Sequence, residues 1–203
     1  MNKKLKDYIL EIIREKDIIL SERKEALEHL SSFIKGKVTN DETVNLNFIC
    51  THNSRRSHLC QVWAATAIAY YKINNINTFS GGTEATAFNP RAVAALERAG
   101  FNIKNPGGDN PKYAISINEQ EAPMVCFSKT WDDQVNPTKN LIAVMTCADA
   151  EKNCPFIPGA DLRIPIKYVD PKESDGTAKE SSTYDERCRQ IAREMFYLAS
   201  QLI

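Results

Sequence analysis

Strand and helix patterns alternate between residues 44 and 100, and this alternation constrains the fold more than any other feature of the chain. The segments 44–49 and 76–80 have the apolar content and length of strands, whereas 54–73 and 89–100 carry apolar residues at helical spacing. A strand, a helix and a second strand in this order form a βαβ unit, in which the crossover is right-handed and the strands are parallel. The pattern therefore predicts an α/β fold.

The second half of the chain supplies two further strands and a closing helix. Residues 141–146, five apolar residues followed by Thr146, predict a buried strand, and residues 163–168 predict a shorter one. With the first two strands they give a Rossmann-like four-stranded parallel sheet with helices on both faces. The segments 113–117 and 123–128 predict an extra β-hairpin, because a polar stretch separates them. Residues 182–203 predict an amphipathic helix.

The first 43 residues are expected to form a helical extension. Apolar residues recur at helical spacing within 3–34, which predicts two helices, the second capped by Ser21. The polar stretch 36–43 predicts a linker, so we place an N-terminal helical extension at 1–43 and the main domain at 44–203. We expect these helices to pack on the main domain; a homodimer contact through them and a separate partner-binding module are the alternatives.

Composition limits the partners and the compartment. The 203 residues carry 26 Lys plus Arg and 26 Asp plus Glu, so no net field attracts nucleic acid or an acidic membrane surface. No apolar run approaches the about 18 residues of a membrane span, and the N-terminus lacks the pattern of a secretory signal. We therefore expect a cytoplasmic protein, in which the six cysteines are reduced and are catalytic, redox-active or simply buried.

The segment CTHNSRRS, residues 50–57, follows the first predicted strand and opens the first predicted helix. Open α/β sheets bind ligands at this place, where backbone N–H groups and a helix N-terminus attract a tetrahedral oxyanion. Arg56 would grip the anion with its planar fork, and the same positive field favours the thiolate of Cys50. Ser57 would donate a hydrogen bond to that thiolate. The loop residues expected around the anion are Thr51, His52, Asn53, Ser54 and Arg55, with the Asn53 amide as a brace.

Other uses of this cysteine are less consistent with the sequence. Zinc binding by Cys50, His52, His58 and Cys60 lacks short metal-type pairs and a second cluster, so no metal is expected. A protease nucleophile does not call for the neighbouring arginines, which suit an oxyanion. An inert buried cysteine remains the plain alternative.

The loop resembles the phosphate loop of low molecular weight protein tyrosine phosphatases and of the thioredoxin-coupled arsenate reductases that share their fold. The resemblance covers about residues 44–203. Four further motifs, in consistent order and spacing along the chain, support the resemblance: Ser80-Gly81-Gly82, Asn89-Pro90, the cysteine pair of TCADAEKNCP and Asp170-Pro171. Two positions depart from the family. His52 stands where glycine is usual and would be strained if that position has a positive φ, and Arg55 stands where a cysteine is often found.

A second cysteine pair, Cys147 and Cys154, follows the predicted strand 141–146. Cys147 is therefore expected at the same sheet edge as Cys50. The intervening ADAEKN suits a helix, which would hold the two Cα atoms about 10 Å apart. A disulfide needs about 4.4 to 6.8 Å, so the pair bonds only if this segment unwinds. The alternative is that Cys147 merely ends a buried strand; Cys60, Cys126 and Cys188 are expected to be packing residues.

The resemblance implies a redox relay that needs no cofactor. The Cys50 thiolate would attack arsenate, Cys147 would attack the Cys50 sulfur and release arsenite, and Cys154 would take over Cys147. The final disulfide would be reduced by thioredoxin. Asp170, before Pro171 in a polar loop, would protonate the leaving oxygen.

Three functions follow from this reasoning. Arsenate reduction is the first, because a plain phosphatase has no use for the second cysteine pair. Phosphomonoester hydrolysis through a phosphocysteine, with Asp170 as acid and then base, is the alternative within enzymes. Lys172, Glu173 and Ser174 stand where the phosphatases have aromatic residues that grip a substrate tyrosine, which disfavours a dedicated tyrosine phosphatase. A non-enzymatic sensor of phosphate or arsenate, with the N-terminal helices as output, is the third.

Overall fold

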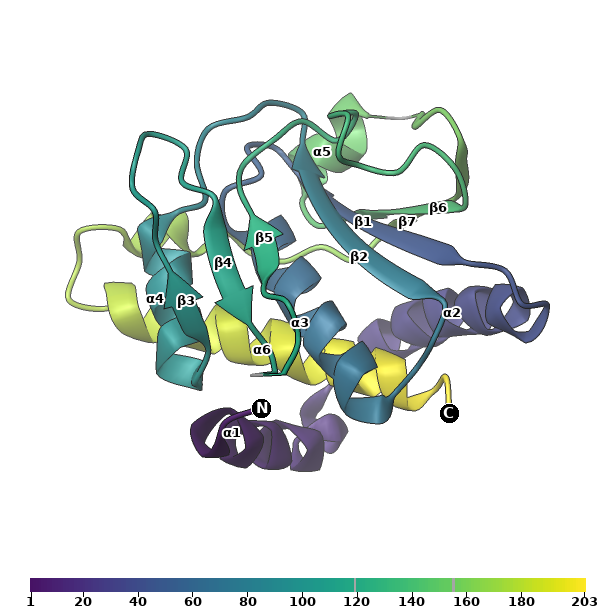
Figure 1. The fold of residues 1–203 in the computed structure, drawn as a ribbon, viewed down its shortest axis with the longest axis horizontal. Coiled ribbons are helices and arrows are strands. Elements are labelled where there is room, and N and C mark those ends of the chain that lie inside the picture. The colour runs from purple at the N-terminus through teal and green to yellow at the C-terminus, as the bar shows by residue number, and fades with distance from the viewer. Residues whose placement is uncertain (119, 155) are drawn as a thin grey trace.

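The parallel sheet positions both cysteine-bearing segments at one edge. In the computed structural model, which describes residues 1–118, 120–154 and 156–203, the four strands run parallel in the order β2-β1-β6-β7 (Figure 1). The central strands β1 and β6 are paired so that Ile49 lies opposite Met145. Their carboxyl ends therefore lie side by side, as predicted. The strands are β1 (Val44–Cys50), β2 (Ile76–Gly82), β6 (Leu141–Met145) and β7 (Ala160–Pro165).

Helices cover both faces of this sheet, but unequally. Side chains of β1 alternate between the faces: Leu46 and Phe48 join the large core beneath α3 and α6, whereas Ile49 faces a smaller cluster that includes Ala150 of α5. The long helices thus lie on one face, and the six-residue α5 with neighbouring loops covers the other (Figure 1). These helices are α3 (Arg56–Tyr71), α4 (Pro90–Ala99), α5 (Ala148–Asn153) and α6 (Glu180–Ser200).

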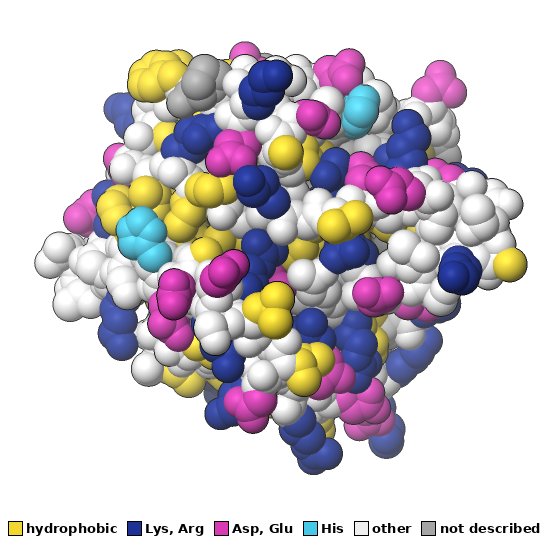
Figure 2. Space-filling view, turned by 180° about the vertical axis from the view of Figure 1, so that it is seen from behind, with side chains coloured by type: hydrophobic (Ala, Val, Ile, Leu, Met, Phe, Trp, Pro, Cys, Tyr) yellow, Lys and Arg dark blue, Asp and Glu magenta, His cyan; other side chains and the backbone are white. Residues whose placement is uncertain are grey.

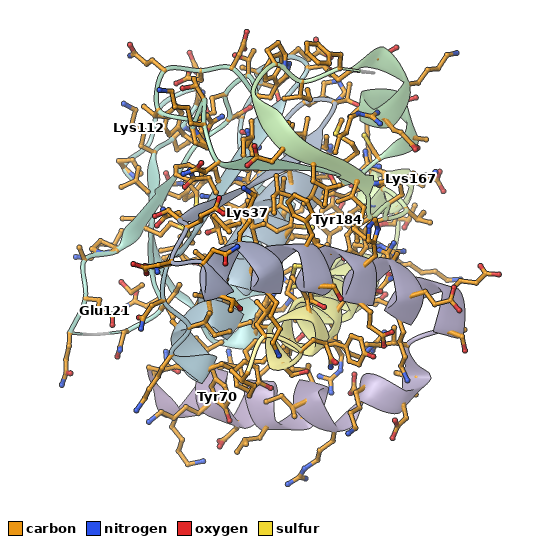
Figure 3. The ribbon with its side chains drawn as sticks, turned by 90° about the vertical axis from the view of Figure 1, so that its right-hand side faces the viewer. Lys37, Tyr70, Lys112, Glu121, Lys167 and Tyr184 are labelled. Atoms are coloured by element: carbon orange, nitrogen blue, oxygen red, sulfur yellow. The ribbon has the colours of Figure 1, made fainter. Side chains whose placement is uncertain are left out.

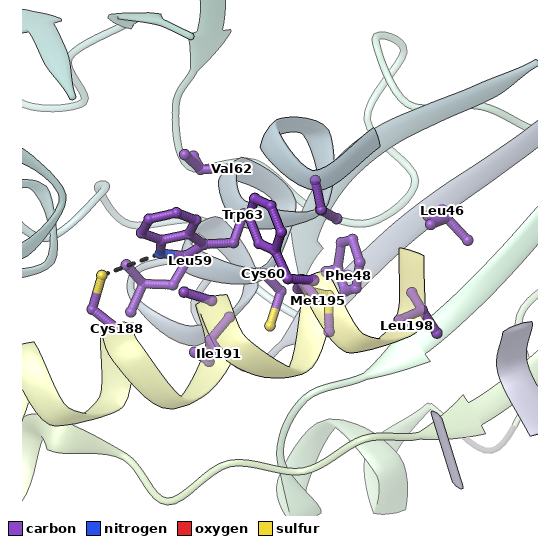
Figure 4. Packing of buried hydrophobic residues seen from close by; sticks show 14 of the residues in the cluster. Leu46, Phe48, Leu59, Cys60, Val62, Trp63, Cys188, Ile191, Met195 and Leu198 are labelled. Carbon is purple, nitrogen blue, oxygen red and sulfur yellow. Dashed lines mark hydrogen bonds between the residues drawn. The ribbon is translucent and has the colours of Figure 1, made fainter. Parts of the chain in front are cut away.

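The large core is organised around Trp63 of α3. Its indole donates to Cys188 Sγ of α6 at 3.2 Å (Figure 4). The indole also meets the Phe101 ring edge-on, with the ring centres 5.0 Å apart. Because the indole N–H has a partner, the ring is buried without an unsatisfied donor. This contact joins the middle of α3, the helix that follows the loop, to the last helix of the chain.

A second, antiparallel sheet packs beside the first. The predicted hairpin is present as β4 (Tyr113–Ser116) and β5 (Met124–Cys126), and a third strand, β3 (Asn102–Lys104), pairs with β4. The strand β3 was not predicted, because its three residues contain one apolar side chain, Ile103.

The N-terminal helices pack directly against the main part of the chain. α1 (Lys3–Arg14) contacts α4 and α6, and α2 (Ser21–Thr39) contacts α6 and β1, with a short 3-10 turn η1 (Lys16–Ile18) between them. The linker predicted at 36–43 is largely wrong, because α2 continues to Thr39 as Ile34 and Val38 pack against the core. The capping prediction is also wrong, since Leu20 occupies the cap position. The division at residue 43 stays a prediction.

The last strand is shifted from its predicted position of 163–168. It ends at Pro165, but the Ile166 and Tyr168 N–H groups still donate to Met145 and Thr146 carbonyls at 2.9 and 3.0 Å. The chain therefore remains extended beside β6 and then forms the 3-10 turn η2 (Pro171–Ser174). This extended stretch leads Asp170 toward the end of β1.

Charges of both signs are interspersed over the surface. Figure 2 shows Lys and Arg side chains alternating with Asp and Glu over the rear face, which agrees with the equal numbers of acidic and basic residues. Within residues 1–118, 120–154 and 156–203, no helix combines the length and apolar character that a membrane span requires.

Candidate active site

Cys50 lies at the end of β1 and contacts Ser57 in the first turn of α3. The Cys50 Sγ and Ser57 Oγ atoms are 3.1 Å apart, and both side chains are buried. Asn53 donates its Nδ2 hydrogen to Ser57 Oγ at 2.8 Å. This bond occupies one lone pair of Ser57 Oγ and leaves the Ser57 hydroxyl hydrogen free to point at the Cys50 sulfur. The arrangement suits a serine that stabilises a thiolate.

The backbone of the loop leaves its donors open. In the part of the chain that the structure describes, the N–H groups of residues 51–57 donate no hydrogen bond to protein acceptors. Asn53 has a φ of 43° and is the loop residue in the left-handed region; His52 is not. The strain anticipated at His52 is therefore absent, and asparagine tolerates the left-handed conformation well. The unpaired N–H groups form the kind of cradle that binds an anion.

The end of β2 packs against the loop at Gly82. A Cβ added to Gly82 would lie 2.6 Å from Asn53 N and 2.6 Å from the Thr51 carbonyl oxygen. The next two residues, Thr83 and Glu84, donate backbone hydrogen bonds to the Cys50 and Thr51 carbonyls at 3.1 and 3.0 Å. Glycine is required here because a strand backbone approaches the loop backbone directly.

The remaining loop side chains turn to different partners. Thr51 Oγ1 lies 3.5 Å from Cys147 Sγ. His52 Nε2 lies 2.9 Å from Glu84 Oε1, and both of these side chains are largely exposed. Ser54 is buried, and its carbonyl accepts from Asn89 N at 2.8 Å, which joins the loop to the start of α4. Asn89 and Pro90 begin this helix as the sequence predicts.

Arg56 is held by the segment that precedes η2. Its Nη1 donates to the Tyr168 carbonyl at 3.1 Å and its Nη2 to Asp170 Oδ2 at 2.7 Å. Its Nε is buried and has no partner within the described residues. A buried N–H without an acceptor costs free energy. An anion that accepted a hydrogen bond from Arg56 Nε would remove this cost. Asp170 is thereby brought to the loop, where its other carboxylate oxygen accepts from Lys172 N at 3.1 Å.

Arg55 has a different environment from Arg56. Its Nε donates to Tyr184 Oη at 2.7 Å and its Nη2 to Asp175 Oδ2 at 3.3 Å, while Tyr184 donates to the other oxygen of Asp175 at 2.8 Å. Two of the three nitrogens of the Arg55 guanidinium are thus already bonded to other side chains. The side chains of Arg55 and His52, both predicted substrate contacts, are therefore directed to other residues.

The second cysteine pair lies beside the loop and is separated by a helix. Cys147 caps α5, and its Sγ accepts from Ala150 N at 3.4 Å. Cys154 follows the helix, and Arg163 Nε donates to its carbonyl at 2.8 Å. Cys50, Cys147 and Cys154 all belong to the apolar cluster on the α5 face. The predicted helix ADAEKN is confirmed, so the two cysteines of the pair stand at its opposite ends.

The remaining three cysteines lie in the large core, apart from this cluster, and burial dominates their surroundings. Burial raises the pKa of Cys126 and of Cys188 to about 12 and raises the pKa of Cys60 well above its usual value. These three thiols lie in β5, α6 and α3, as packing residues would. Burial also raises the pKa of Cys154, which slows its reaction while α5 is folded.

His58 is a core residue. Its ring stacks on Phe88 with centroids 4.0 Å apart, and its Nδ1 lies 3.2 Å from Ser80 Oγ. Burial lowers the pKa of His58 well below its usual value, and the charge of Lys129 adds to this effect. Among the described residues, no group of three or more His, Cys, Asp or Glu side chains is placed to hold a metal ion.

A loop that sequence reasoning missed supports the cradle from outside. Ser128 Oγ donates to the His52 carbonyl at 2.9 Å, and Lys129 N donates to Asn53 Oδ1 at 2.9 Å. Trp131 N donates to the Gly82 carbonyl at 2.9 Å, and Gly82 N donates to the Lys129 carbonyl at the same distance. Residues 128–131 lack the periodicity of a helix or strand. The one sequence signal for a loop here was the polar composition of the stretch after a predicted hairpin.

Fold and site together define a class: a parallel α/β domain with a Cys-x5-Arg oxyanion loop at the end of its first strand and a carboxylic acid beside the arginine. Cys50 Sγ lies beside Ser57 Oγ in this loop, the Arg56 Nε is buried without a partner among the described residues, and Asp170 lies beside Arg56. Such an arrangement can hold a tetrahedral anion while a thiolate attacks its central atom.

Comparisons with known proteins agree with this class. No protein-family model matches the chain. An arsenate reductase of Bacillus licheniformis is 29% identical over 142 residues, which cover 70% of this chain and 84% of that protein. An arsenate reductase of Staphylococcus aureus is 30% identical over 111 residues, which cover 55% and 66% of the two chains. A low molecular weight phosphotyrosine phosphatase of Vibrio cholerae O395 has the same fold, with a TM-score of 0.54 at 16% identity over 77% of this chain and 95% of its own.

In sequence the chain is similar to arsenate reductases, and its fold is that of the low molecular weight protein tyrosine phosphatases. These relatives are all enzymes, and the prediction of an enzyme is confirmed. The predicted four-stranded parallel sheet with helices and an additional antiparallel hairpin is confirmed as well.

Proposed function

We propose that the protein reduces arsenate to arsenite with Cys50 as nucleophile and Cys147 and Cys154 as a disulfide relay. The contact that carries the proposal is Cys147 Sγ at 3.5 Å from Thr51 Oγ1, which puts a second thiol beside the residue that follows the nucleophile. Phosphate-ester hydrolysis needs one cysteine, and a second thiol at the loop serves a redox step. The names of the arsenate reductases similar to this chain support the same substrate.

The reaction begins with arsenate in the loop. The Cys50 thiolate attacks arsenic and forms an S–As bond, and one arsenic–oxygen bond breaks as Asp170 supplies the proton that lets the oxygen leave as water. The Arg56 Nε and the loop N–H groups hold the remaining oxygens. The Ser57 hydroxyl, which Asn53 orients, stabilises the thiolate before attack.

The redox step follows by thiol–disulfide chemistry. The Cys147 thiolate attacks the Cys50 sulfur, an S–S bond forms, and the S–As bond breaks with its electron pair on arsenic, which leaves as arsenite. Cys154 then attacks Cys147 and frees the Cys50 thiolate. Because α5 stands between Cys147 and Cys154 and burial raises the pKa of Cys154, this step requires α5 to unwind. We propose thioredoxin, a cytosolic dithiol, as the donor of the two electrons that reopen the final disulfide.

Cys147→Ser tests the relay against simple hydrolysis. The variant should lose arsenate turnover with thioredoxin and keep hydrolysis of an aryl phosphate, since serine cannot form a disulfide and the loop is intact. Cys188→Ser is the matched control, because Cys188 is equally buried and the serine hydroxyl still accepts from Trp63. The control should keep both activities.

Two outcomes would contradict the proposal. Equal loss of both activities in Cys147→Ser would make Cys147 a structural residue. Failure of the wild-type protein to release any arsenite in a single turnover would leave the loop as a binding site for phosphate or arsenate, with the N-terminal helices as its output.

The position of Asp170 favours phosphomonoester hydrolysis as a second function of the same loop. Its carboxylate is fixed 2.7 Å from Arg56 Nη2, beside the place where a leaving alkoxide needs a proton. Asp170→Asn should slow hydrolysis of an aryl phosphate by about 100-fold or more. Hydrolysis at the wild-type rate would exclude Asp170 as the acid.

A further inference from the structure

Arg23, in the first turn of α2, reaches the segment that holds Arg56. Its Nη2 donates to the Lys167 carbonyl at 2.9 Å, and its guanidinium carbon lies 4.4 Å from the centre of the Tyr168 ring. Figure 3 shows Lys167 above one end of α2, with Lys37 at the other end. The N-terminal extension therefore contacts the backbone that leads to Asp170.

The same segment fixes two of the three nitrogens of the Arg56 guanidinium. Nη1 is bonded to the Tyr168 carbonyl and Nη2 to Asp170. The guanidinium is planar, so these two bonds also set the direction of Nε, the nitrogen left for an anion. A shift of Tyr168 would turn Nε away from the cradle.

The Tyr168 ring is buried in the large core, against the Arg23 guanidinium. One side of the segment is tied to β6 by the Ile166 and Tyr168 N–H groups. The Tyr168 hydroxyl is buried and has no hydrogen-bond partner within the described residues, so the ring is held by packing and by the Arg23 guanidinium. A cation over an aromatic face and a charge-assisted hydrogen bond to the neighbouring carbonyl together fix both the ring and the backbone.

Arg23 is itself held rigidly by α6. Its Nε donates to Glu194 Oε2 at 2.7 Å, and the Glu194 side chain is 3% exposed. Gln190 donates to the other oxygen of Glu194 at 3.0 Å. The charge of Arg23 is therefore paired, and its fork is presented to Lys167 and Tyr168 in one orientation.

We propose that Arg23 is a positioning residue for Arg56, so that the N-terminal extension completes the oxyanion site of the main domain. The inference rests on the proposed oxyanion function of the loop. Contacts run from Glu194 to Arg23, from Arg23 to Tyr168, and from Tyr168 to Arg56. The extension is then a structural part of the active site, and its loss would weaken anion binding.

A purely stabilising role for Arg23 makes a different prediction, and Arg189 provides the comparison. Arg189 also lies over a tyrosine, with its guanidinium carbon 5.2 Å from the centre of the Tyr8 ring, and also joins α6 to the extension by donating to Glu15 and Glu11. None of these contacts reaches the 166–170 segment. The substitution Arg189→Lys therefore makes the same chemical change at the same kind of interface, away from the loop.

The test compares Arg23→Lys with Arg189→Lys, using inorganic phosphate as the probe and calorimetry as the measurement. Lysine keeps the charge for Glu194 but cannot donate to Glu194 and to the Lys167 carbonyl while lying flat on Tyr168. Arg23→Lys should raise the dissociation constant for phosphate about fivefold. Arg189→Lys should leave it within about twofold of the wild type. The Nε–H resonance of Arg56 should shift in Arg23→Lys and stay in place in Arg189→Lys.

Each outcome decides between the alternatives. Wild-type phosphate affinity and an unshifted Arg56 resonance in Arg23→Lys would overturn the positioning role. Absence of phosphate binding by the wild-type protein would instead overturn the proposed function of the loop, and this inference with it. If Arg23→Lys does not unfold cooperatively, the double variant Arg23→Gln, Glu194→Gln removes both buried charges, and the same loss of phosphate affinity is expected from it.

Discussion

Asn53 and Arg55 illustrate how single residues of the loop divide its tasks. Asn53 takes the left-handed conformation, orients Ser57 and accepts from Lys129, so that one side chain fixes both the turn and the hydroxyl beside the nucleophile. Arg55 points to Tyr184 and Asp175 instead. The two arginines of the loop therefore differ: Arg56 keeps a buried Nε without a partner among the described residues, and Arg55 ties the start of α3 to α6.

Arg55→Ala should destabilise the protein without weakening anion binding. Asp175 and Tyr184 lose a charged partner at a site that is mostly shielded from water, so the free energy of unfolding should fall by about 1 to 3 kcal/mol. Urea unfolding and phosphate calorimetry measure the two effects separately. Weaker phosphate binding with unchanged stability would instead place the Arg55 guanidinium at the anion.

At the scale of elements, the site depends on how closely three backbones meet. β2 ends against the loop at Gly82, the 128–131 stretch bonds to both, and Thr146 at the end of β6 donates to the Ile49 carbonyl. None of these contacts involves a charged side chain. The cradle is therefore shaped by strand ends and not by the side chains that face the anion.

Gly82→Ala should disrupt the loop. The added methyl would lie 2.5 to 2.6 Å from backbone atoms of Glu84, Asn53 and Thr51. Displacing these backbone atoms would cost free energy. Gly36→Ala is the control, because its methyl would meet nothing within 4 Å in the exposed face of α2. We expect Gly82→Ala to lose phosphate binding and stability, and Gly36→Ala to gain about 0.5 to 1 kcal/mol of stability. Unchanged phosphate binding by Gly82→Ala would contradict this account of the cradle.

The sequence predicted those elements whose signals are local. The apolar runs of β1 and β6 and the helix within the segment 89–100 are confirmed. The missed features depend on distant partners. The left-handed residue is Asn53 and not His52, because Gly82 and Lys129 determine the path of the loop. The partners of Arg55 lie 120 and 129 residues away, and no local pattern indicates them.

At the scale of the whole molecule, the extension and the main domain share one core. Leu5, Ile9 and Ile12 of α1 and Leu27, Leu30 and Ile34 of α2 are fully buried in the cluster that contains Trp63. Removing the extension would expose this apolar surface, which is costly. The extension is thus continuous with the core that supports α3 and, through Arg23, with the segment that holds Arg56.

The stability of the folded protein should depend on His58 at mildly acidic pH. Burial and the Lys129 charge lower the pKa of His58, so the unfolded chain binds a proton below about pH 6.5 while the folded protein does not. The stability is fully present above this pH and falls as the pH drops below it, by up to about 1.4 kcal/mol per pH unit. His58→Gln should reduce this slope in urea unfolding between about pH 7.5 and about pH 5.5. If His58→Gln leaves this slope unchanged, the pH dependence of the stability arises from other groups.

A single turnover of Cys154→Ser with arsenate tests whether the first disulfide of the relay joins Cys50 to Cys147. Without Cys154 the relay should stop after its first disulfide, so one equivalent of arsenite should be released per protein. Peptide mapping of the product should then find Cys50 joined to Cys147. Arsenite released with both cysteines still free, or a disulfide that joins Cys50 to another cysteine, would contradict the relay.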